Sequence, residues 1–319
     1  MLAEVPHDEP LDGQDTGSRA VQRELFLRTL IGRSSLPSTR ELAELLRDGF
    51  FEAGAVLYTE GSASDQVYFI VRGTVSASRK GGVAHEFGPG SVLGVLDAQQ
   101  DHPHARTAVA STEVEALVLS AEDRLELLED SFEHTRGMIR ISSEGLADVG
   151  YAPNERGEPG PTLAPKPEPL LLIERVFTLR DTPAFRKASI QALVSLAPAG
   201  DELRLAADEV LFERGDAKNV FYVVVAGDIE LERPGLGRAC FRAASLLGGG
   251  GAFAGGLARQ RARAVTSSVV LRLREEDFYD VMEDHFELAR SVLSYIAGEH
   301  ERRLDAIEQA AEDGVVQAG

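Results

Sequence analysis

Hydrophobic residues recur with two different periods along the first half of the chain. Residues 25, 27, 30 and 31 are apolar at helical spacing, and a second helical stretch covers Thr39–Leu46. Short segments that alternate between apolar and polar residues follow at Ala55–Thr59, Val67–Val71 and Thr74–Ala77. Glycines separate these segments at turn spacing, which is typical of an antiparallel β-barrel or jelly roll. Helical periodicity returns at Asp123–Asp130 and Phe132–Ile141.

The periodicity stops between Gly150 and Pro169. This stretch holds six of the 14 prolines of the chain, at positions 153, 159, 161, 165, 167 and 169. Proline fixes φ and removes a backbone donor, so a segment this rich in proline forms neither helix nor sheet. We interpret it as a semi-extended linker.

The second half repeats the first. A gap-free shift of 154 residues pairs Gly61 with Gly215, and Gly73 with Gly227. The same shift pairs further aromatic, glycine and acidic positions, among them Phe87 with Phe241, Gly94 with Gly248, and Phe132 with Phe286. One unbroken offset across such different residue types indicates a tandem duplication.

These features divide the chain into five parts. We predict a disordered acidic tail over 1–20, a first domain over 21–149 and a linker over 150–169. A second domain over 170–310 and a disordered tail over 311–319 follow.

Composition narrows the classes of function. The chain of 319 residues carries 33 Lys and Arg against 52 Asp and Glu, a formal net charge of -19, and has no basic run, so we expect no nucleic-acid binding. The single cysteine, Cys240, excludes an internal disulfide and a multi-cysteine zinc site, and is interpreted as a small buried apolar residue in a strand. No apolar run has the length of a membrane span, and the N-terminus does not resemble a signal peptide, so we expect a cytoplasmic protein without membrane insertion.

Two long stretches of the first repeat resemble the cyclic nucleotide-binding domain family. They are Phe51–Gly61, FEAGAVLYTEG, and Asp65–Val75, DQVYFIVRGTV, followed by Phe87–Gly94 and Arg106–Val109. The second repeat keeps the frame in Val210–Gly215 and Val220–Gly227. The resemblance implies two tandem eight-stranded β jelly rolls flanked by α-helices, a mainly β fold.

The resemblance also implies a phosphate-binding cassette, which is a short helix between two strands followed by an arginine. Helix N–H groups and a guanidinium attract a cyclic phosphate, and a glutamate early in the helix accepts from the ribose 2′-OH. In the first repeat the candidate ligand-binding residues are Gly94, Val95, Leu96, Arg106, Thr107 and Ala108. Val95 stands in place of the glutamate, so this repeat keeps the phosphate half of the site and lacks the sugar half.

The second cassette departs further from the family pattern. Its equivalents are Gly248, Gly249, Gly250, Gln260, Arg261 and Ala262. Gln260 lies opposite Arg106, although Arg259, Arg261 and Arg263 are close enough for a shifted loop to present one of them. The run Gly248–Gly251 disfavours a helix and predicts either a flexible degenerate loop or a backbone nest for an anion.

Two further features, a polar loop and a C-terminal amphipathic stretch, allow both a functional and a purely structural interpretation. Asp97, Asp101, His102 and His104 have residue types that bind metals, but polar residues in a loop after a helix are ordinarily solvent-exposed. No nucleophile elbow, P-loop or zinc-protease motif is present, so we predict that the chain is not an enzyme. The amphipathic stretch Phe286–Ile307 predicts a C-terminal helix that packs on its own barrel. The resemblance implies two other roles for this helix, which are to cover a ligand or to pair with a second copy in a homodimer.

Two hypotheses about function follow. In the first, the chain is a regulatory or adaptor protein without a cofactor. Its first domain senses a cyclic nucleotide, such as cAMP or cGMP, or a related phosphate ligand, and signals to a protein partner. In the second, it is a ligand-free scaffold for protein interactions that has lost nucleotide binding.

Overall fold

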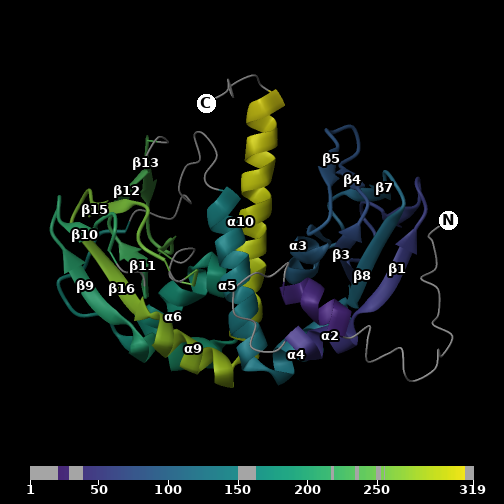
Figure 1. Ribbon diagram of the computed structural model, residues 1–319. Helices are drawn as coiled ribbons and strands as arrows, with labels where there is room; N and C mark the ends of the chain where they lie inside the picture. The colour runs from purple at the N-terminus through teal and green to yellow at the C-terminus, as the bar shows by residue number, and fades with distance from the viewer. Residues whose placement is uncertain are drawn as a thin grey trace. The chain divides into compact units, whose positions relative to one another are not determined.

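The computed structural model describes residues 21–28, 39–149, 163–216, 219–233, 237–248, 253–254 and 256–312. The chain divides into two compact units, Met1–Met138 and Ile139–Gly319. Each described unit has eight strands and flanking helices, which confirms the predicted pair of jelly rolls (Figure 1).

The first unit begins with a helical segment, residues 21–28, followed by α2 (Thr39–Leu45). Its strands are β1 (Arg47–Phe51), β2 (Val56–Tyr58), β3 (Gln66–Arg72), β4 (Val75–Ser78), β5 (His85–Phe87), β6 (Val92–Leu93), β7 (Thr107–Ala110) and β8 (Val114–Ser120). They form two antiparallel sheets with the orders β1-β8-β3-β6 and β2-β7-β4-β5. The short helix α3 (Val95–Gln100) connects β6 to β7, and α4 (Ala121–Asp130) follows β8. Helix α5 (Phe132–Val149) continues from this unit into the second.

The second unit repeats this order. Its first helical elements are α6 (Leu172–Asp181), η1 (Pro183–Phe185), α7 (Ile190–Leu196) and η2 (Ala197–Ala199). The strands are β9 (Asp201–Leu205), β10 (Val210–Phe212), β11 (Val220–Ala226), β12 (Ile229–Arg233), β13 (Gly237–Phe241), β14 (Leu246–Leu247), β15 (Arg261–Ala264) and β16 (Ser268–Arg274). They pair in the orders β9-β16-β11-β14 and β10-β15-β12-β13. The closing helices are α9 (Glu275–Asp284) and α10 (Phe286–Glu312), and α10 extends five residues beyond the predicted C-terminal helix.

The shift of 154 residues holds in three dimensions. The strand β3 begins at Gln66 and β11 at Val220, and both show a register shift near the same place, between Ile70 and Arg72 and between Val224 and Ala226. Every buried residue of the barrel cluster in the second unit lies 154 positions after a buried residue of the first barrel cluster. The duplication therefore preserved the core and not only the turn residues.

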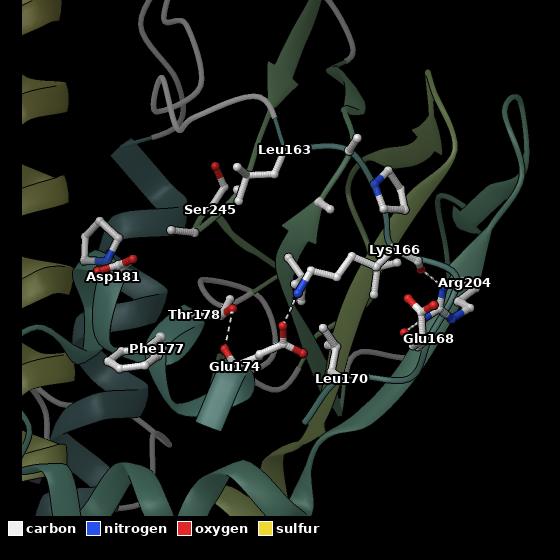
Figure 2. Close-up of a pocket in the computed structure, with 18 of the residues that line it drawn as sticks. Leu163, Lys166, Glu168, Leu170, Glu174, Phe177, Thr178, Asp181, Arg204 and Ser245 are labelled. Atoms are coloured by element: carbon white, nitrogen blue, oxygen red, sulfur yellow. Dashed lines mark hydrogen bonds and ion pairs between the residues drawn. The ribbon is translucent and has the colours of Figure 1, made fainter. Parts of the chain in front are cut away.

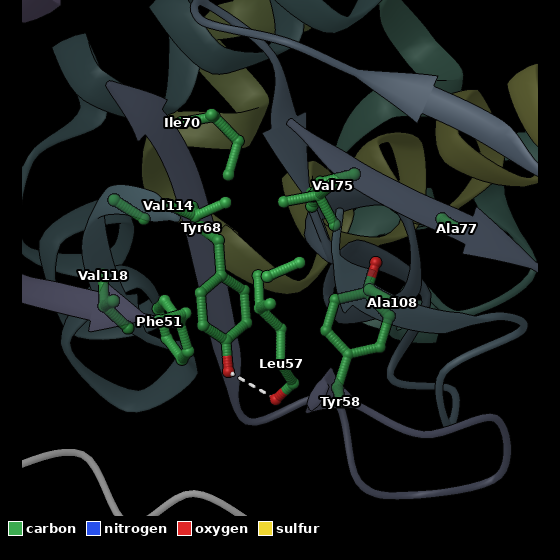
Figure 3. Close-up of a cluster of buried hydrophobic side chains, with 13 residues drawn as sticks. Phe51, Leu57, Tyr58, Tyr68, Ile70, Val75, Ala77, Ala108, Val114 and Val118 are labelled. Atoms are coloured by element: carbon green, nitrogen blue, oxygen red, sulfur yellow. Dashed lines mark hydrogen bonds between the residues drawn. The ribbon is translucent and has the colours of Figure 1, made fainter. Parts of the chain in front are cut away.

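The interior of the first barrel is filled by side chains from both of its sheets (Figure 3). Phe51 and Tyr58 pack on either side of Tyr68, with ring centroids 6.0 and 5.8 Å apart. The Tyr68 hydroxyl donates to the backbone oxygen of Leu57 at 3.2 Å, and burial raises the pKa of Tyr68 to about 12. A β-bulge in β2 turns the neighbours Leu57 and Tyr58 inward together, because the bulge interrupts the strict alternation of the strand.

Two predicted boundaries differ from the structure. The second half of α5, from Ile139, groups with the second unit rather than with the first. Residues 163–169 of the predicted linker are attached to the second unit, since the Gly227 amide donates to the Leu163 oxygen at 2.8 Å. The rest of the linker, 150–162, the predicted tail over 1–20 and residues 313–319 lie outside the described residues. The tail predicted over 311–319 is wrong for 311–312, which belong to α10.

Glycine is required at Gly73 by both backbone conformation and space. Its φ is +88°, and a Cβ there would lie 2.1 Å from the carbonyl oxygen of Glu113. Gly54 has nearly the same φ, +87°, and nothing within 4 Å of its Cβ position. A comparison of Gly54 with Gly73 therefore separates the free-energy cost of a left-handed backbone from that of a steric clash.

We expect Gly54→Ala to lower the free energy of unfolding by about 1–2 kcal/mol, the ordinary cost of a left-handed L-residue. Gly73→Ala should cost at least about 2 kcal/mol more, because a backbone carbonyl cannot move aside cheaply. Urea unfolding followed by circular dichroism measures both. Equal losses for the two variants would contradict the steric argument.

Candidate functional site

The first candidate site is the α3 segment and the start of β7 in the first unit. Helix α3 begins after Gly94, which has a φ of +79°, and a Cβ at Gly94 would lie 2.8 Å from the Gln66 carbonyl oxygen. The cassette helix predicted from the sequence is therefore present, and glycine at its start lets the chain pass close to β3.

Strand phase determines which residues near β7 can reach the barrel. Ala108 and Ala110 are buried in the barrel core, whereas Thr107 and Val109 are half-exposed. Arg106 precedes the strand in phase with Ala108 and is half-buried. Thr107 lies on the other face, where its hydroxyl accepts from the Glu60 amide at 2.9 Å.

Burial and nearby charges both act on the Tyr58 hydroxyl of the barrel. Burial raises its pKa, the Asp97 carboxylate raises it further, and Arg106 acts in the opposite direction. Asp97 of α3 and Arg106 therefore act on this barrel residue with opposite signs.

Val95, the candidate at the family's glutamate position, packs with apolar residues. It contacts a cluster that includes Val67 and Phe69 of β3 and Leu27 of the first helical segment. Leu96 beside it is half-buried, and its carbonyl oxygen accepts from the Gln100 amide group. Neither side chain supplies an acceptor for a sugar hydroxyl.

The polar loop after α3 has a different organisation from the one expected. His104 is only 2% exposed, its Nδ1 lies 3.0 Å from Asp97 Oδ2, and its ring stacks on Tyr58 with centroids 3.7 Å apart. The interpretation of this loop as exposed polar residues is wrong for His104, whereas Asp101 and His102 are exposed. Within the described part of the chain, no three His, Cys, Asp or Glu side chains are arranged to hold a metal ion. Cys240 lies in β13 as predicted but is exposed, so the interpretation of this cysteine as a buried residue is wrong.

A buried arginine links the cassette to the helix that follows the barrel. Arg124 of α4 donates to the Ala98 carbonyl oxygen at 3.0 Å, near the end of α3. The residue in register in the second unit is Phe278, which packs edge-on against Phe221 and contacts Phe253. Sequence analysis missed this link, although an arginine at an apolar helical position was a signal that could have indicated it.

The second cassette carries no equivalent cation at the barrel-facing position. Gly248 has a φ of +83°, Gln260 is half-buried before β15, and Ala262 is buried in the barrel core. Arg261 and Arg263 alternate with buried alanines and form ion pairs on the outer face, Arg261 with Glu213 at 3.1 Å. The shifted loop that would present one of these two is therefore not formed. Gly249 and Gly250 lie outside the described residues.

A pocket of about 990 Å³ lies outside the second barrel (Figure 2). Its walls are α6, the outer face of β11 and β16, and residues 163–170, which we call the strap. Lys166 of the strap pairs with Glu174 of α6, and Phe177 lines the pocket with 61% of its surface exposed. The pocket contains none of the residues predicted from the sequence to bind a ligand.

The comparisons with known proteins identify the family. The model of the cyclic nucleotide-binding domain matches residues 49–131 and 202–285, more than half of the chain. The chain belongs to this family and carries the domain twice, which confirms the resemblance found in the sequence.

Individual relatives are more distant. A cyclic nucleotide-gated potassium channel of Rhizobium etli is 35% identical over 83 residues, which are 26% of this chain and 23% of the channel. The chain thus spans about a quarter of that relative's length. No described helix has the length and hydropathy needed to cross a bilayer.

Two solved structures align over nearly the whole chain with low scores. The regulatory domain of Toxoplasma gondii PKA with cAMP has a TM-score of 0.34 and 16% identity, covering 91% of this chain and 99% of that one. The regulatory subunit of a cAMP-independent protein kinase A from Trypanosoma cruzi, bound to guanosine, has a TM-score of 0.35 and 14% identity, covering 100% and 99%.

Arg204 of β9 bonds to the strap by donating to the carbonyl oxygens of Lys166 and Glu168 at 2.5 Å each. We expect Arg204→Met to release the strap, and the amides of Leu170 and Gly227 to exchange about tenfold faster. Both amides report on it, because Leu170 donates to Glu202 and Gly227 to the Leu163 oxygen.

Hydrogen exchange measured by NMR tests this prediction. Arg238→Met is the matched control, because Arg238 forms an exposed ion pair with Glu230 away from the strap. Unchanged exchange at both amides in Arg204→Met would show that the strap is held without this arginine.

Proposed function

We propose that this protein is a non-enzymatic regulatory protein whose first domain senses a cyclic nucleotide, or a related phosphate ligand, and signals to a protein partner. One observation carries the proposal. Arg106 enters β7 in phase with the barrel-facing alanines, whereas Gln260 holds this position in the second domain. A guanidinium is suited to a phosphate because it donates two parallel, charge-assisted hydrogen bonds.

The ligand contacts expected in the first domain are mainly to the phosphate. Val95 supplies no acceptor for a ribose hydroxyl and packs with apolar residues. A missing hydrogen bond of this kind weakens binding by about 1–3 kcal/mol, roughly tenfold to a hundredfold in the dissociation constant. We therefore expect modest affinity, in which the cyclic phosphate contributes more than the sugar.

The contact between Arg124 and Ala98 supplies a route from the site to the rest of the molecule. A ligand that moves α3 changes the distance from the Ala98 carbonyl to Arg124, and therefore favours a different position of α4. A protein partner that contacts α4 or α5 in only one position would read this shift.

The test is the ligand-induced rise in unfolding temperature with cAMP and cGMP. We expect wild type to be stabilised and Arg106→Ala to lose roughly tenfold or more in affinity, because the charge-assisted contact is worth about 1.5–3 kcal/mol. Arg72→Ala is the control in the same domain, since Arg72 is exposed and bonds to Glu115 at 3.1 Å. It should bind like wild type.

The scaffold hypothesis predicts the opposite result. A protein that has lost ligand binding would show no shift at millimolar nucleotide in wild type or in either variant. That outcome would contradict the sensor proposal.

A further inference from the structure

Asp97 organises the loop that leads to Arg106. Its backbone oxygen accepts from the amides of Asp101 and His102, and its Oδ1 accepts from the Ala105 amide at 3.3 Å. Its Oδ2 lies 3.0 Å from His104 Nδ1. Asp97 therefore contacts four residues of the loop, the last of which is Ala105. Arg106 follows Ala105 directly in the chain.

His104 is enclosed on several sides. Its ring stacks on Tyr58, and a Cβ at Gly94 would lie 3.2 Å from its Cε1. Its backbone bonds to the turn at residues 61–62, donating to Ser62 and accepting from Gly61 at 2.8 Å each. Because a carboxylate oxygen accepts hydrogen bonds, we assign Nδ1 as the donor in this part-buried pair.

The second domain shows that the barrel does not need this pair. Ala258, in register with His104, makes the same backbone bonds, accepting from Gly215 at 2.8 Å and donating to Asp216 at 2.9 Å. By the same shift, Gly251 replaces Asp97 and Gln260 replaces Arg106. The carboxylate, the imidazole and the arginine are thus present together in one domain and replaced together in the other.

We propose that Asp97 and His104 form an internal clamp that orders the loop 101–105 and so positions Arg106 toward the barrel. The pair acts through Arg106 and does not itself contact the ligand. The value of the clamp for ligand binding rests on the proposed function, whereas its effect on Arg106 does not.

The experiment measures Arg106 directly, in the full-length chain without ligand. The rate of modification by phenylglyoxal is followed for the Arg106 peptide by mass spectrometry, with the exposed Arg72 as internal reference. Hydrogen exchange is followed over residues 102–106. The variants are Asp97→Ala and His104→Ala, with Asp97→Asn as the conservative replacement that keeps an acceptor for the Ala105 amide.

We expect Arg106 modification and loop exchange to rise by about tenfold in both alanine variants, since a local opening becomes more frequent. Asp97→Asn should restore most of the protection. Asp101→Asn is the matched control, because Asp101 is exposed in the same loop with a φ of 58°, which asparagine tolerates. It should behave like wild type. The second barrel has alanine, Ala258, at the position of His104, so we expect His104→Ala to fold. This variant still tests the clamp if Asp97→Ala unfolds.

Unchanged Arg106 reactivity in folded Asp97→Ala and His104→Ala would overturn the clamp, and so would a rise in Asp101→Asn of the same size. Nucleotide titration forms a separate arm. If the clamp acts through Arg106, Asp97→Ala should weaken cAMP or cGMP binding relative to wild type, and the double variant Asp97→Ala/Arg106→Ala should be no weaker than Arg106→Ala. Wild type could bind neither nucleotide while Arg106 is protected in wild type and modified faster in the alanine variants. That result would contradict the proposed function and support the clamp.

Discussion

The phase of the strand that follows the cassette is the constraint on which the candidate sites depend. In β7 and β15 alike, two alanines face the barrel and the residues between them face outward. A basic side chain points toward the barrel only if it lies an even number of residues from these alanines. A shift by one residue places it on the outer face of the strand. Arg106 meets this condition. Arg261 and Arg263 do not, and their guanidinium groups form ion pairs with surface carboxylates instead.

The sequence was sufficient for the repeat and the fold, because these depend on alternation, turn glycines and one constant offset. Gly73 and Gly227 illustrate this, since both have a positive φ and backbone or side-chain atoms within 3 Å of the Cβ position. Such positions admit little besides glycine, so the pattern survived the divergence of the two halves.

Two features could not be predicted because they depend on side chains that are distant in sequence. His104 stacks on Tyr58, which follows the bulge in β2, and no periodicity indicates either feature. The strap is bonded to Arg204, which lies nearly 40 residues later in the chain. Proline content correctly excluded helix and sheet from the strap. It did not indicate that the strap's carbonyl oxygens, which have no partners within a helix or sheet, accept hydrogen bonds from an arginine.

The contact between the cassette and the helix that follows the barrel has different chemistry in the two domains. In the first, the Arg124 guanidinium is buried and bonds to a carbonyl oxygen of α3, so a small displacement of α3 breaks a directional interaction. In the second, Phe278 packs among aromatic rings, and such contacts change gradually with distance. A directional contact in a buried position responds sharply to movement, whereas an apolar contact mainly adds stability. The domain that carries Arg106 also carries this directional contact, so two residues that distinguish the first domain lie at its cassette, Arg106 after α3 in the chain and Arg124 bonded to the Ala98 carbonyl oxygen.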